Sequence, residues 1–135
     1  MKKLLSTHYS AGAFNVAMLF LRIVSGALMM SHGYSKLVSF ASKKNTFMNF
    51  LGIGSATSLS LTIFAEFFCA LFIIIGLFTR LAVIPLIVVM TVAIFKAHNA
   101  DFFGEAEKAS LYLAAFVVLL FVGPGKASVD GMVGK

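Results

Sequence analysis

Residues 59–78, LSLTIFAEFFCALFIIIGLF, decide the fold class of this chain. The run holds one charged side chain, Glu66, and its length matches the roughly 20 residues that a helix needs to cross a bilayer. Because the hydrocarbon core offers the backbone no hydrogen-bond partners, a lipid-exposed segment of this length must be helical. The segment therefore predicts a transmembrane helix.

Three more apolar segments accompany it along the chain, at residues 14–34, 81–97 and 107–122. Of the 135 residues, 60% are hydrophobic and 12% charged, and the mean hydropathy is +0.99. Soluble domains carry about 25% charged residues, and so short a chain cannot hide this much apolar surface from water. We therefore expect an all-α fold in which residues 1–135 form one transmembrane domain. It would be a four-helix bundle of up-down-up-down topology with both termini on the same face.

The net charge of +6 indicates lipid headgroups rather than nucleic acid as the partner of the basic residues. These residues lie at the edges of apolar runs, and the longest basic runs are pairs, whereas nucleic-acid binding needs a dense patch. With four spans, the lysines and arginines divide almost equally between the two faces. The acidic residues of the third connection favour that face being outside, so we expect cytoplasmic termini. The membrane that we expect is the plasma membrane of a prokaryote.

The small residues within the predicted spans indicate packing. Cys69 is the only cysteine, which excludes an internal disulfide or a CxxC redox pair and with it a thiol–disulfide enzyme. Gly26, Gly33 and Gly76 are expected where helix backbones approach closely.

Two charged side chains inside predicted spans, Arg22 and Glu66, are the first candidates for function, since such charges are costly in lipid. Helical side chains tilt toward their own N-terminus, so these two lean apart in antiparallel neighbours. A direct ion pair between them remains one alternative. The other places Arg22 in a structural polar cluster with Arg80 and Asp130, where Asp130 neutralises an arginine.

The same tilt directs Glu66 toward the end of the bundle where the first and third helices end and the fourth begins. Ionisable and hydroxyl side chains from all four helices would meet at this end of the bundle, which we call the polar mouth. We predict catalytic roles for Glu66, His32 and His98, and ligand binding by Lys36, Glu107 and Tyr112. A metal site is not expected.

Structural roles for these residues stay open. Glu66 in its protonated form would bond a neighbouring helix, and His32 and His98 would be ordinary interfacial side chains. The two histidines lie at similar depth, as bis-histidine haem ligation requires, but the chain has no other feature that supports haem. The residues therefore leave the cofactor unknown, and haem is not favoured.

Several short motifs in fixed order resemble those of a known family. They are the segment 21–26 (LRIVSG), the segment 32–37 (HGYSKL), Ala65-Glu66, the segment 76–82 (GLFTRLA), Met90, Ala93, His98, Glu107 and the segment 123–130 (GPGKASVD). Together they span nearly the whole chain, and they resemble the DoxX family of small four-helix integral membrane proteins. Relatives in that family include a membrane subunit of an archaeal thiosulfate:quinone oxidoreductase.

This resemblance implies a quinone-linked oxidoreductase subunit, with the polar mouth as its quinone or substrate site and a redox subunit as partner. Because quinone reduction takes up two protons, a buried carboxylate beside a histidine suits that chemistry. The alternative is a non-catalytic membrane protein, either an assembly partner or a small-solute transporter. A homo-oligomer is compatible with either function.

Overall fold

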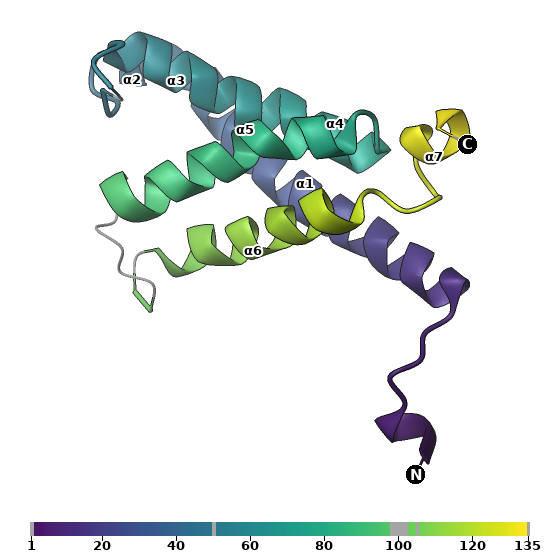
Figure 1. Cartoon of the computed structure of the whole chain (residues 1–135). Coiled ribbons are helices and arrows are strands. Elements are labelled where there is room, and N and C mark those ends of the chain that lie inside the picture. The colour runs from purple at the N-terminus through teal and green to yellow at the C-terminus, as the bar shows by residue number, and fades with distance from the viewer. Residues whose placement is uncertain (1, 50, 98–102, 105, 135) are drawn as a thin grey trace.

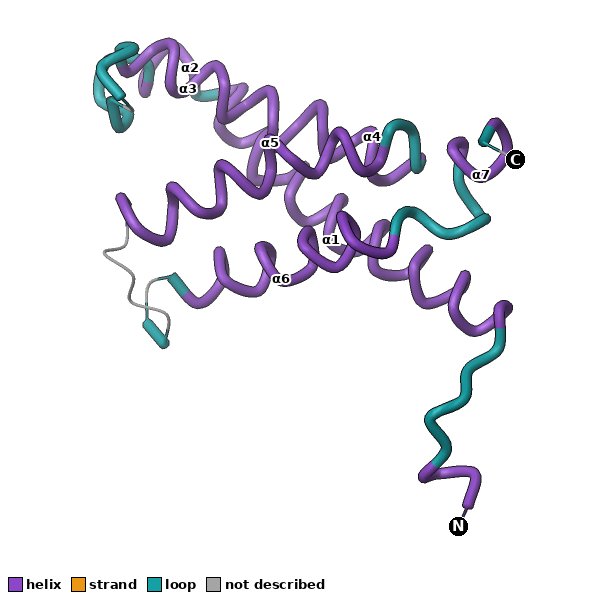
Figure 2. Tube along the Cα trace, in the orientation of Figure 1, coloured by secondary structure: helices purple, strands orange, loops and turns teal. Residues whose placement is uncertain are grey.

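The computed structural model describes residues 2–49, 51–97, 103–104 and 106–134. The described residues form helices and connections with no strand, which confirms the predicted all-helical fold (Figure 2). A short 3₁₀ turn, η1 (Lys2–Leu5), precedes the long helix α1 (Ala11–Val38). The Ser10 hydroxyl caps this helix by accepting the Ala13 N–H at 3.0 Å. The helix therefore begins before the predicted apolar segment 14–34.

The segment that decided the fold class is one continuous helical stretch with a change of winding in its middle. It consists of α3 (Ser55–Ile63), the π-helix η2 (Phe64–Cys69) and α4 (Ala70–Ile75). The next stretch repeats this design, because α5 (Thr79–Val92) continues as the π-helix η3 (Ala93–Ala97). The remaining helices are α2 (Phe40–Lys43), α6 (Glu107–Val122) and α7 (Val129–Val133).

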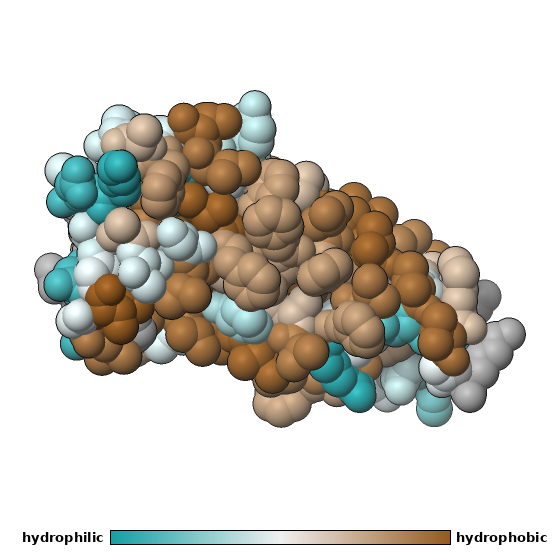
Figure 3. All heavy atoms as spheres, turned by 90° about the horizontal axis from the view of Figure 1, so that it is seen from above, coloured by the Kyte–Doolittle hydropathy of each residue, from teal (hydrophilic) through white to brown (hydrophobic). Residues whose placement is uncertain are grey.

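Three of these stretches are long and apolar enough to cross a membrane: Ala11–Val38, Ser55–Ile75 and Thr79–Lys96. Helix α6 coincides with the predicted segment 107–122 but has only 16 residues. It packs along α5, while α1 packs against η2 and α4 (Figure 1). Large apolar side chains remain exposed along these helices, and apolar residues cover much of the middle of the face in Figure 3. Such a surface suits lipid as the solvent.

The turn between α4 and α5 lies three residues earlier than predicted. The predicted segments 59–78 and 81–97 leave only Thr79 and Arg80 as their connection, but these residues begin α5. The chain reverses through Gly76 (φ +75°) and Phe78 (φ +49°), both in the left-handed region. Glycine adopts this conformation without a Cβ penalty, so Gly76 ends α4.

Two glycines of α1 fix how closely it crosses the second stretch. A Cβ on Gly33 would lie 2.6 Å from the carbonyl carbon of Glu66, and one on Gly26 would lie 2.7 Å from Ile74 Cγ1. The predicted close approach at both positions is therefore confirmed. Because Gly33 touches the backbone of η2 directly, the last turns of α1 are held beside Glu66.

Candidate functional site

Glu66 lies within the π-helix η2 and is buried, with 4% of its surface exposed. A π-helix widens one turn and shifts the side chains after it, and such turns often occur at functional sites. The contact with Gly33 places this turn against α1, one helical turn before Lys36. The local geometry thus brings a buried carboxylate to the end of α1.

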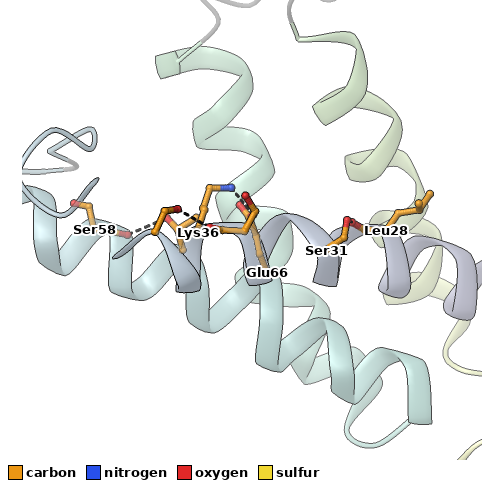
Figure 4. Close-up of polar contacts among 8 residues, drawn as sticks. Leu28, Ser31, Lys36, Ser58 and Glu66 are labelled. Atoms are coloured by element: carbon orange, nitrogen blue, oxygen red, sulfur yellow. Dashed lines mark hydrogen bonds and ion pairs between the residues drawn. The ribbon is translucent and has the colours of Figure 1, made fainter. Parts of the chain in front are cut away.

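The partner of Glu66 is Lys36. The Lys36 ammonium donates to Glu66 Oε1 at 2.6 Å, and the two side chains are 25% and 5% exposed (Figure 4). Figure 4 shows the lysine reaching from α1 to the carboxylate on the neighbouring helix. A carboxylate at this depth is costly without a counter-charge, and the short ion pair supplies one.

One cavity beside this pair is mostly apolar, and we call it the apolar pocket. Its volume is about 300 Å³. It lies between α3 and α5 and is lined by Lys36, Phe47, Met48, Ile53, Ser58, Leu61, Thr62, Glu66, Val88, Val89, Val92 and Ala93. Leu61 and Val88 are 54% and 49% exposed, so part of the lining of this cavity lies at the apolar surface of the helices.

The connection after α1 forms part of the wall of this pocket. Phe47 and Met48 follow the short helix α2 and are half-buried against the apolar pocket. Their apolar character was visible in the sequence, but the cavity they cover was not.

A second cavity of about 290 Å³ lies on the other side of the ion pair, and we call it the polar pocket. It lies between α1, α5 and α6 and is lined by Met29, His32, Lys36, Glu66, Met90, Ala93, Lys108, Ala109 and Tyr112. The two pockets share Lys36, Glu66 and Ala93. The ion pair therefore forms part of a wall between an apolar and a polar cavity.

Two of the other predicted site residues, His32 and Tyr112, belong to this region. His32 and Tyr112 line the polar pocket and meet edge to face, with ring centroids 5.9 Å apart. Tyr112 also stacks on Phe116 at 6.1 Å. Glu107 is exposed and lines neither pocket, while its neighbour Lys108 lines the polar one. His98 lies outside the described residues.

Arg22 is bonded at the other end of the molecule, not to Glu66. Arg22 is 2% exposed, and its guanidinium donates hydrogen bonds of 2.7–3.1 Å to the carbonyls of Ile73, Ile74, Pro124 and Ala127. The first two belong to the last turn of α4, where the carbonyl groups of a helix carry partial negative charge. Arg22 thus ties α1 to the end of α4 and to the C-terminal segment.

Asp130 and Arg80 also interact with helix ends. The Asp130 carboxylate accepts the backbone N–H groups of Phe78 and Thr79 at 2.8 and 2.9 Å, at the N-terminus of α5. Arg80 is exposed, and its Nη2 lies 3.4 Å from the Phe121 carbonyl near the end of α6. Each charge is opposite in sign to the partial charge of the helix end that it contacts, so Asp130 and Arg80 act at helix ends and do not pair with one another.

Within the described part of the chain, no group of three or more His, Cys, Asp or Glu side chains is placed to hold a metal ion. The Lys36–Glu66 ion pair lines both cavities, so its groups could exchange protons with a ligand in either one. Sequence patterns gave no sign of the two π-helices, since neither contains a proline or glycine that would mark a change of winding.

The fold and this site define a helical integral membrane protein with a buried ion pair between two cavities. The sequence model of the DoxX family matches residues 17–99, which is more than half of the chain. The chain therefore belongs to the DoxX family. The match includes Arg22, His32, Lys36 and Glu66 and ends before α6. No curated protein and no solved structure matches the chain significantly.

Proposed function

We propose that this protein is the membrane subunit of a quinone-linked oxidoreductase and that the apolar pocket holds the quinone ring. The observation that carries the proposal is the Lys36–Glu66 pair at the edge of an otherwise apolar, lipid-facing cavity. A quinone is an apolar molecule with two hydrogen-bond-accepting oxygens, so it needs this combination of surfaces. The volume of about 300 Å³ suits the ring, with the isoprenoid tail left in lipid.

The residues of the pair have separate roles in this proposal. The Lys36 ammonium donates a hydrogen bond to one quinone oxygen and fixes the ring against the wall. Glu66 exchanges a proton with that oxygen, because a carboxyl group within hydrogen-bond reach is a general acid or base. His32 and Tyr112 lie on the far side of the pair, and we retain His32 and His98 as proton-handling candidates. Electrons come from a redox partner subunit.

The membrane arrangement that we propose is a four-helix bundle formed by one domain. Helix α6 and the three longer stretches would cross the membrane in alternating directions. Both termini would then lie on the cytoplasmic face of a prokaryotic plasma membrane. At 1.5 Å per residue, α6 spans about 24 Å, so the adjoining residues would have to complete its crossing of a core about 30 Å thick. Its apolar sequence and its packing along α5 support this assignment.

Thermal stabilisation by quinones tests the proposal. Purified protein in detergent would be heated with ubiquinone or menaquinone analogues, using Lys36→Met and Glu66→Gln as site variants. Glu107→Gln is the matched control, because Glu107 is an exposed carboxylate outside both pockets. A ligand at 100 times its Kd stabilises a protein by about 2.7 kcal/mol.

We expect quinone to raise the melting temperature of wild type and of Glu107→Gln. In the two site variants, most of this increase should be lost. A response that is equal in all four proteins would contradict the proposal. No stabilisation of folded wild type by either quinone class would instead favour a non-catalytic assembly partner or a transporter.

A further inference from the structure

The two pockets differ in where they open. The polar pocket has Lys108 and His32 at its rim, and these lie at the beginning of α6 and near the end of α1. Both positions are at the end of the bundle that carries α2 (Figure 1). Lys108 is exposed and His32 is half-buried. The apolar pocket instead opens laterally, past exposed Leu61 and Val88.

The pockets also differ in the polar atoms that they offer to water. The hydroxyls in the apolar pocket donate back along their own helix, Ser58 to the Gly54 carbonyl at 2.7 Å and Thr62 to the Ser58 carbonyl at 2.9 Å. The polar pocket is lined by five ionisable side chains from three elements: His32, Lys36, Glu66, Lys108 and Tyr112. An internal water needs two to four polar partners. Both pockets share Lys36 and Glu66, but the polar pocket adds His32, Lys108 and Tyr112 and therefore suits water better.

From this asymmetry we propose that the polar pocket is a water-filled access path that exchanges protons between the aqueous end of the bundle and Glu66. A proton that reaches Glu66 comes from water at the Lys108–His32 rim, and Glu66 releases a proton either back to this water or, under the proposed function, to the quinone. No electron transfer is involved. Water reaches the Lys36–Glu66 pair from the polar pocket only, and a ligand enters the apolar pocket from the lipid. This inference holds whether or not the apolar pocket binds quinone.

Thiol accessibility at position 66 tests which side water comes from. In a Cys69→Ala background, Glu66→Cys would be the single thiol, and the protein would be treated with the membrane-impermeant sulfonatoethyl methanethiosulfonate. Two matched substitutions then fill one pocket each: Ala109→Phe in the polar pocket and Val92→Phe in the apolar pocket. The modification rate is measured by mass spectrometry, and gel filtration checks that each variant is folded.

We expect Ala109→Phe to slow modification of the thiol at least tenfold and Val92→Phe to change it less than twofold. The reverse order would overturn the proposal, and so would a folded Glu66→Cys protein that the reagent does not modify. If Glu66→Cys does not fold, single thiols at Ala109 and Val92 replace it, with Ala70→Cys as the buried control outside both pockets. The thiol at 109 must then react at least tenfold faster than the other two. Equal rates at 109 and 70 would refute the access path.

Discussion

The Lys36–Glu66 pair depends on both partners. Removing the lysine leaves a carboxylate that is only 5% exposed without a counter-charge. Breaking a buried ion pair costs about 3–5 kcal/mol, and the partial exposure of Lys36 places this pair at or below the low end. We therefore expect Lys36→Met to lower the free energy of unfolding by roughly 2–3 kcal/mol.

A double variant separates the cost of an unpaired charge from the value of the pair. Lys36→Met combined with Glu66→Leu removes both charges and should be more stable than Lys36→Met alone. Denaturation in detergent would measure both variants. If the double variant were the less stable one, Glu66 would not be an uncompensated carboxylate in Lys36→Met, and our description of the pair would be wrong.

At the residue scale, the sequence predicted where polar side chains lie better than it predicted their hydrogen-bond partners. The tilt of helical side chains separated Arg22 from Glu66 and brought Glu66 toward Lys36, as the structure shows. The partners of Arg22 are backbone carbonyls, which every residue has, so no sequence pattern identifies them. For the same reason, the role of Asp130 as a cap of α5 could not be predicted.

Asp130, which caps the N-terminus of α5, allows a direct test of the helix caps. Its carboxylate satisfies two N–H groups at the start of α5, more than 50 residues away along the chain. We expect Asp130→Ala to lower the free energy of unfolding by about 1–2 kcal/mol, as loss of a helix cap does. Thermal unfolding in detergent would check this. Unchanged stability would mean that these hydrogen bonds are replaced by water in the folded protein.

At the scale of elements, the crossing of α1 over η2 depends on Gly33. A Cβ at this position would lie within 3 Å of three backbone atoms of Glu66 and Phe67. Since backbone cannot move aside as a flexible side chain does, we expect Gly33→Ala to separate the helices and cost about 1–3 kcal/mol.

Gly12→Ala is the matched control, because Gly12 lies in the same helix with no atom within 4 Å of an added Cβ. It should leave stability unchanged or raise it by up to about 1 kcal/mol, as alanine favours helix. Equal effects of the two substitutions on the melting temperature would contradict the close approach.

The sequence predicted the existence of the helices but not their winding. The boundaries of α6 agree with the apolar segment, and α1 is longer than its apolar core because polar caps extend it. The π-helix η2 determines the direction of Glu66, yet its residues FAEFFC contain no proline or glycine that would mark a change in winding. The shared wall between the pockets was therefore beyond sequence analysis.

At the scale of the whole molecule, membrane topology is the next prediction. If α6 crosses the bilayer, the C-terminus and the connection before α6 lie on opposite sides. We expect alkaline phosphatase to be active when fused at residue 103 and inactive at the C-terminus, where green fluorescent protein should fluoresce. Phosphatase activity at both positions would exclude α6 as a span with a cytoplasmic C-terminus.

The central claim is that the apolar pocket beside Lys36 and Glu66 binds a quinone, and fluorescence quenching tests it most directly. The chain has no tryptophan, so Leu61→Trp at the lip of the pocket provides a single reporter. Leu111→Trp on α6, exposed and outside both pockets, reports quinone that is merely dissolved in the detergent micelle.

We predict saturable quenching of Leu61→Trp by a menaquinone analogue and its loss when Lys36→Met is added. Leu111→Trp should show only a weak, linear decrease. The same linear quenching at both positions, unaffected by Lys36→Met, would contradict a quinone site in this pocket.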